Sequence, residues 1–209
     1  MQVLFVHGMG RSPASGWWML RQLRRAGLST SSFGYSVSHG SFEKVANRLV
    51  GRLRSLLEGE ELVLIGHSLG GVLLRDALCS LGETGKRARH LFLLGSPIQT
   101  ARLAIRLGGN PLFRLATRDC GQLLASSERM AAIGVPEVPT TAIVGTRGIL
   151  NRRGPFGTET NDGIVSLSEV SAGWLEDRVF VPVVHTLLPS SGRVTAVILE
   201  TLRRASAIR

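Results

Sequence analysis

The sequence predicts an α/β fold, a three-layer α/β/α sandwich around a mostly parallel six-stranded sheet. Apolar runs of strand length recur along the 209 residues, with amphipathic segments between them. Runs such as Val63–Ile65 and Phe92–Leu94 are apolar at consecutive positions, as expected for parallel strands that are covered on both faces. Ligands of such sheets bind at the carboxyl ends of the strands. Each strand exit is therefore a candidate site.

The predicted strands follow one another at intervals that suit a crossover helix. The six runs are QVLFVHG at 2–8, SSFGYSV at 31–37, ELVLIGH at 61–67, HLFLLGS at 90–96, TTAIVGT at 140–146 and RVFVPVV at 178–184. The connecting segments have apolar residues at helical spacing, for example Val45, Leu49 and Leu53. Right-handed crossovers place such helices on both faces of the sheet.

One interval is too long for a single crossover helix. Some forty residues separate the fourth and fifth strands, between Ser96 and Pro136, and we predict a helical cap or lid insertion at about 98–135. Its short amphipathic segments are interrupted at Gly108, Gly109 and Pro111. No linker is visible, so residues 1–209 are expected to form one domain. The loop 145–163 is also long and rich in glycine, which is typical of functional loops.

The composition bounds the choice of partner and compartment. The net charge is +10, which suits nucleic acid or an anionic membrane, or reflects only a coding bias towards arginine. Because the arginines are spread along the chain and aromatic residues make up 5%, we predict no nucleic-acid partner. No apolar run approaches membrane-spanning length and no signal peptide is visible, so we expect a cytoplasmic protein. Cys79 and Cys120 are expected to be free thiols.

A serine lies between glycines where the third strand gives way to a helical pattern. Gly66, Ser68 and Gly70 fit the G-x-S-x-G pattern of a nucleophile elbow, in which a strained turn exposes the serine hydroxyl. Helix N-termini favour developing negative charge. We therefore predict that Ser68 is a nucleophile. The alternative is that Ser68 only caps the following helix.

A serine nucleophile needs a base, and the base needs an orienting acid. His185 follows the last strand, whereas His7 and His67 belong to the glycine motifs and the other two histidines flank earlier strands. We predict that His185 is the base. Asp162, in the loop after the fifth strand, is the predicted acid, with Glu159 in reserve. In the alternative, Asp162 only forms a turn with its neighbours.

Acyl transfer also needs backbone donors for the oxyanion. The turn at the exit of the first strand, with glycines at 8 and 10, exposes the N–H of Met9. The residue after the nucleophile, Leu69, supplies the natural second N–H. We predict that these two groups form the oxyanion hole, although the first turn also fits an ordinary strand-to-helix connection.

Four motifs together resemble the α/β-hydrolase superfamily. They are HGMG at 7–10, GHSLGG at 66–71, NDGIV at 161–165 and VHTLL at 184–188. The sequences of these motifs are most similar to those of bacterial triacylglycerol lipases, esterases and related lipid deacylases. The resemblance implies nucleophile, acid and base at Ser68, Asp162 and His185. The chain departs from the family pattern in starting at what would be the third strand of the full fold and in showing no secretion signal. It also has no cluster of carboxylates like the calcium site of some secreted lipases.

The resulting hypothesis is a serine hydrolase that cleaves carboxylic esters, of lipase or esterase type, through an acyl-enzyme. The expected substrate is a small-molecule ester or lipid, and no metal or organic cofactor is implied. Alternatives are a thioesterase, acyltransferase or amidase on the same fold, or a non-catalytic binding module. The predicted cap would supply an apolar acyl pocket, and its arginines suit transient contact with an anionic membrane surface. The alternative is ordinary surface helices with solvated arginines.

Overall fold

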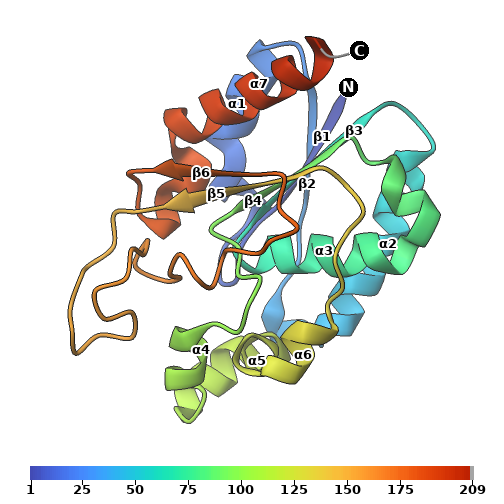
Figure 1. Cartoon of the computed structure of the whole chain (residues 1–209). Coiled ribbons are helices and arrows are strands. Elements are labelled where there is room, and N and C mark those ends of the chain that lie inside the picture. Colours follow the sequence, from blue (N-terminus) through green and yellow to red (C-terminus); the bar gives the residue numbers. More distant parts are fainter. Residues whose placement is uncertain (208–209) are drawn as a thin grey trace.

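The computed structural model describes residues 1–207 and contains one six-stranded sheet (Figure 1). The strand order is β2-β1-β3-β4-β5-β6, and all five pairings are parallel. The strands are β1 (Gln2–Val6), β2 (Ser29–Phe33), β3 (Leu62–His67), β4 (His90–Leu94), β5 (Thr140–Gly145) and β6 (Asp177–Val181). The predicted fold class is confirmed.

Helices cover both faces of the sheet. The α-helices are α1 (Trp17–Arg25), α2 (Phe42–Leu57), α3 (Leu69–Leu81), α4 (Arg102–Leu107), α5 (Pro111–Ala125), α6 (Ser127–Ala132) and α7 (Gly192–Ala207). Short 3-10 helices lie at Pro13–Gly16, Val37–His39, Gly82–Arg87 and His185–Ser190. In Figure 1, α1 and α7 lie on one side of the sheet, and α2 and α3 lie on the other.

The two halves of the core follow the alternation of side chains along the strands. In β1, Val3 and Phe5 pack in the cluster that contains α1 and α7, whereas Leu4 and Val6 pack in the cluster that contains α2 and α3. All four side chains are fully buried. This two-sided burial explains why the central strands are apolar at consecutive positions.

The second strand differs from its predicted position. It covers Ser29–Phe33 rather than 31–37, because an edge strand that pairs only with β1 does not need an apolar sequence. The predicted strand included Tyr35, which lies beyond the end of β2. Its ring stacks on His7, with 4.3 Å between ring centroids.

The long interval between β4 and β5 contains α4, α5 and α6. The breaks expected at Gly108, Gly109 and Pro111 fall between α4 and α5. A further break lies inside α5, where Arg118 has a positive φ of 46°. In Figure 1 these helices lie beyond the sheet, at the same end as the loop between β5 and β6.

Within residues 1–207, no helix is long and apolar enough to span a membrane. Both cysteines are free thiols, as predicted, and Cys120 is buried whereas Cys79 is exposed.

Candidate active site

Ser68 occupies a sharp turn between β3 and α3. Its φ of 52° and ψ of −125° are unusual for a residue with a side chain, and such conformations are strained. The turn is held by the Ser68 N–H, which donates to the carbonyl of Leu94 at 3.0 Å, and by the hydroxyl of Ser96, which donates to the carbonyl of Ser68 at 2.7 Å. The Ser68 side chain makes no capping hydrogen bond to α3. It therefore does not act as the helix cap.

The glycines around Ser68 are required by close backbone approach. A Cβ on Gly66 would collide with the backbone of Gly71, and a Cβ on Gly70 would collide with the carbonyl of Val6. These contacts let α3 pack tightly against β3 and β1. The glycine pattern thus positions the turn that carries Ser68.

Asp162 and His185 form a buried pair. The Asp162 Oδ2 lies 2.7 Å from the His185 Nδ1, and both residues are at most 5% exposed. The Asp162 Oδ1 accepts two backbone N–H groups, from Ile164 and Val165, each at 2.9 Å. The His185 N–H also donates to the Asp162 carbonyl at 2.9 Å. Because Nδ1 is engaged by the carboxylate, Nε2 is the imidazole nitrogen that is available to accept a proton.

Gly95 is a part of this site that the sequence analysis missed. It follows β4 with a φ of 51°, and a Cβ there would lie 2.8 Å from Asp162 Oδ2 and 3.0 Å from His185 Nδ1. Only a glycine satisfies both the backbone conformation and the space. The available signal was the position of this glycine at a strand exit.

The exit turn of β1 lies directly beside Ser68. A Cβ on Gly8 would be 3.1 Å from the Cβ of Ser68, and Met9 follows in the same turn. The turn is supported by His7, whose carbonyl accepts the hydroxyl of Tyr35 at 2.9 Å. Leu69, the other predicted oxyanion residue, is fully buried and opens α3, so its N–H has no partner within that helix.

His67 supports the backbone of His185. Its Nε2 donates to the His185 carbonyl at 3.1 Å, and the two ring centroids are 4.8 Å apart. Burial, together with the nearby His185, holds the pKa of His67 well below its usual range. His67 is therefore a neutral, structural residue at neutral pH.

Ser68 and His185 line the same cavity. Its volume is about 290 Å³, and its lining is mostly apolar. The lining residues are Gly8, Met9, Arg11, His67, Ser68, Pro97, Ala101, Leu103, Ala104, Leu107, Phe113, Leu124, Ile164, Val165, His185 and Thr186. Helices α4 and α5 supply one apolar wall of this cavity, through Leu103, Ala104, Leu107, Phe113 and Leu124.

Glu159, the reserve acid, is engaged elsewhere. Its carboxylate contacts the guanidinium of Arg102 and accepts the Ser168 N–H at 2.7 Å. These hydrogen bonds outweigh the effect of burial and lower the pKa of Glu159 to about 2. Arg102 also lies over the ring of Phe156. This contact joins the start of α4 to the loop that carries Asp162.

Among the side chains of residues 1–207, no group of three or more His, Cys, Asp or Glu residues is arranged to hold a metal ion.

This geometry, with a serine in a strand-to-helix turn and an Asp–His pair at neighbouring strand exits, is typical of the α/β-hydrolase class. Residues 3–201 match the sequence profile of the alpha/beta hydrolase family. The chain belongs to this family. No curated protein sequence matches it significantly.

Solved structures share the fold at low sequence identity. The mature lipase BlEst2 of Bacillus licheniformis is 19% identical, with a TM-score of 0.76 over 96% of this chain and 91% of that one. The metagenomic carboxyl esterase MGS0156 is 16% identical, with a TM-score of 0.75 over 100% and 76%. The RedJ thioesterase of prodiginine biosynthesis in Streptomyces coelicolor is 18% identical, with a TM-score of 0.62 over 96% and 88%.

Proposed function

We propose that the protein is a serine hydrolase that cleaves carboxylic esters through an acyl-enzyme, with Ser68, His185 and Asp162 as its catalytic triad. The observation that carries the proposal is that the strained Ser68 and the Asp162-bound His185 line one apolar cavity. An apolar wall suits an acyl chain, and a buried Asp–His pair suits activation of a hydroxyl.

In the first half of the reaction, the Ser68 Oγ forms a bond to the ester carbonyl carbon, and His185 Nε2 takes the hydroxyl proton. The carbonyl electrons move to the oxygen, which the N–H groups of Met9 and Leu69 stabilise. The tetrahedral intermediate then expels the alkoxide, which leaves as the alcohol after it receives the proton from His185. Asp162 holds the imidazole in the required tautomer and stabilises its charged form.

In the second half, a water molecule attacks the acyl-Ser68 carbonyl while His185 accepts the proton of that water. Collapse of the second intermediate releases the acid, and the proton returns to the Ser68 Oγ. The cycle ends with the enzyme unchanged, and it requires no cofactor.

The test uses a fluorophosphonate probe and a nitrophenyl ester series from acetyl to palmitoyl. We expect the native protein to be labelled and to hydrolyse at least one ester. Ser68→Ala should lose labelling and lower kcat by several orders of magnitude, since triad members act as a unit. Retained turnover in Ser68→Ala, with unchanged thermal stability, would contradict the assignment.

The same triad could also cleave thioesters or amides, because a serine nucleophile does not determine which leaving group is expelled. Acyl thioesters and anilides of the preferred chain length are therefore assayed beside the ester. A kcat/KM that is highest for the ester supports the proposal. A higher value for the thioester or the anilide would make the protein a thioesterase or an amidase, and absence of both labelling and turnover would support a non-catalytic binding module.

A further inference from the structure

Two neighbouring segments lie on the side of the molecule where α4 and α5 line the cavity. One is the outer part of α4 and α5, residues 103–118, and the other is the loop after β5, residues 146–158. They adjoin each other, because Arg102 at the start of α4 packs over Phe156 of the loop at 5.6 Å from its ring centroid. Leu103, Leu107 and Phe113 of the first segment also line the cavity that holds Ser68. We call these two segments the rim.

The rim is strongly basic. It contains six arginines and no aspartate or glutamate, so 29 residues carry six of the ten net positive charges of the chain. None of these arginines forms a salt bridge with another residue in the described range 1–207, and all six are exposed. They are Arg106, Arg114, Arg118, Arg147, Arg152 and Arg153.

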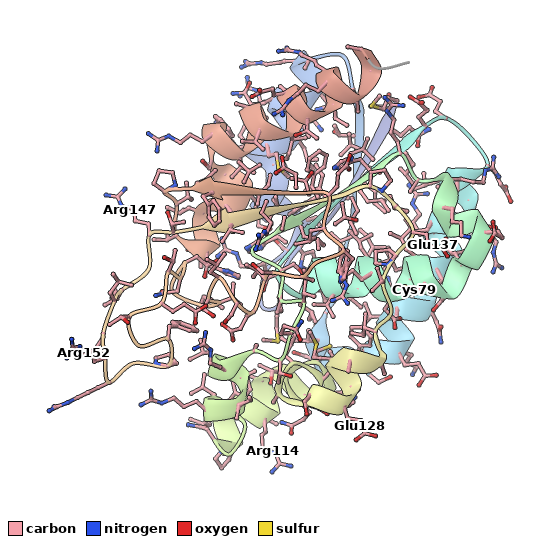
Figure 2. The ribbon with its side chains drawn as sticks, viewed as in Figure 1. Cys79, Arg114, Glu128, Glu137, Arg147 and Arg152 are labelled. Atoms are coloured by element: carbon pink, nitrogen blue, oxygen red, sulfur yellow. The ribbon has the colours of Figure 1, made fainter. Side chains whose placement is uncertain are left out.

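Figure 2 shows where three of the six rim arginines lie. Arg114 projects outward from α5, and Arg147 and Arg152 project outward from the loop. Asp119 and Glu159, which directly follow the two segments, are paired with Arg129 and Arg102, so they do not neutralise the six rim arginines. The concentration of charge therefore points to a binding partner that is negatively charged.

The rim also exposes large aliphatic side chains between its arginines. Leu112, Leu115 and Ile149 are 75%, 68% and 82% exposed, and Ile105 and Leu150 are also more than half exposed. Single exposed leucines are common, but five in two adjoining segments beside a binding cavity indicate an interaction surface.

We propose that the rim docks onto the surface of an anionic lipid bilayer. An anionic bilayer can bind both kinds of rim side chain: arginines bind lipid phosphates, and aliphatic side chains insert at the boundary between headgroups and acyl chains. Nucleic acid would use the charge but not the aliphatic side chains, and its bases stack on aromatic rings. The large exposed apolar residues of the rim are all leucine or isoleucine and none is aromatic, so lipid fits better than nucleic acid.

Docking at the rim brings the cavity that contains Ser68 next to the bilayer. A lipid ester could then pass from the bilayer into the cavity without entering water. The inference that the substrate is such a lipid rests on the proposed function. The docking itself does not, because it depends only on surface residues.

The test measures binding to 100-nm vesicles by co-sedimentation, with Ser68→Ala as the host so that binding is independent of hydrolysis. Vesicles of phosphatidylcholine alone are compared with vesicles that contain about one-third phosphatidylglycerol. We expect binding to the anionic vesicles, with a loss when salt is raised to about 0.5 M. The variant R114Q/R152Q/R153Q should lower the partition coefficient on the order of a hundredfold, from the contribution of each arginine near a charged bilayer.

The matched control removes the same charge elsewhere. Arg52, Arg54 and Arg203 are exposed residues of α2 and α7, and R52Q/R54Q/R203Q should lower the partition coefficient less than about threefold. Equal losses in the two triple variants would overturn the proposal, because the effect would then be one of net charge. No binding of the host to anionic vesicles would also overturn it.

The exposed leucine and isoleucine side chains of the rim are tested separately, because the arginines alone would bind either an anionic lipid or a nucleic acid. The variant L112S/L150S should lower vesicle binding on the order of a hundredfold at constant charge, since each leucine side chain that leaves water contributes about 1.5 kcal/mol. Unchanged vesicle binding in L112S/L150S, with equally tight binding of a DNA duplex, would overturn the lipid proposal in favour of a polyanion surface. Vesicle binding by the host without ester hydrolysis by the native protein would leave the docking proposal standing and remove the proposed function.

Discussion

At the residue scale, Gly95 connects backbone conformation to the Asp162–His185 pair. Alanine there would require a left-handed conformation, which costs about 1–2 kcal/mol, and its Cβ would press on both members of the pair. We expect Gly95→Ala to lower kcat about 10- to 100-fold, since small misplacements of catalytic groups have effects of that size. Steady-state kinetics and thermal denaturation measure the two consequences.

Gly27 provides the matched control. Its φ is 88°, but a Cβ there meets no atom within 4 Å. Gly27→Ala should therefore lose only the stability that its backbone conformation costs, without losing kcat. If Gly95→Ala kept its kcat, the close approach of Gly95 to the pair would have no role in the reaction.

Asp162 and Glu159 are three residues apart but have different partners. Asp162 contacts His185 Nδ1, whereas Glu159 contacts Arg102. We expect Asp162→Asn to lower kcat on the order of 10³- to 10⁴-fold, because the amide favours the wrong imidazole tautomer. Glu159→Gln should stay within a few-fold of the native kcat. The reverse pattern would transfer the role of the acid to Glu159.

The sequence could suggest a candidate site residue only where a local pattern marks it. The glycines around Ser68 and the strand-exit positions of Asp162 and His185 are visible in a single segment each. Gly95 and the support of His185 by His67 depend on contacts between β3, β4 and the 3-10 helix at His185–Ser190. Such contacts between distant segments have no signature in one sequence.

At the element scale, the central strands were predictable because burial on both faces dictates their composition. The edge strand β2 was misplaced, since its sequence STSSF carries little apolar signal and Tyr35 serves the turn at His7 instead. The break of α5 at Arg118 was also not predictable, because no glycine or proline marks it.

Helices α4 and α5 provide one apolar wall of the cavity, and we expect this wall to determine the accepted chain length. Replacing residues 101–124 with a short glycine-serine linker should abolish turnover of a decanoyl ester while turnover of an acetyl ester persists. The reason is that a short acyl group needs little of that wall. The assay compares kcat/KM for the two esters.

A milder variant guards against misfolding of the linker protein. Leu103→Trp fills the cavity from α4 and should lower kcat/KM for the decanoyl ester at least tenfold more than for the acetyl ester. Equal losses on both esters in a folded Leu103→Trp protein would mean that α4 does not determine chain length.

At the scale of the whole molecule, three buried histidines link stability to pH. Burial lowers the pKa of His7, His67 and His90, and for His90 the pKa falls to about 4. His90 is the first residue of β4, and its Nε2 lies 2.9 Å from the hydroxyl of Thr141. These groups stay neutral in the folded protein at pH values at which they are protonated in the unfolded chain.

The sign of the effect follows from proton binding. Below a pH of about 6.5 the unfolded chain takes up a proton on His90, but the folded protein does so only near pH 4, so stability falls between these values. The lowered pKa of His90 corresponds to a loss of about 2 kcal/mol between pH 7 and pH 5. The lowered pKa values of His7 and His67 act in the same direction.

Chemical denaturation at pH 7 and pH 5 tests this account. The native protein should lose unfolding free energy at the lower pH, and the contribution of His90 to that loss should be about 2 kcal/mol. His90→Gln keeps a side-chain donor near Thr141 but cannot be protonated, so its loss should be smaller by about the same amount. Its stability at pH 7 can differ from that of the native protein, because only the difference between the two pH values is compared. An identical pH dependence in the two proteins would mean that His90 is not the source of the acid sensitivity.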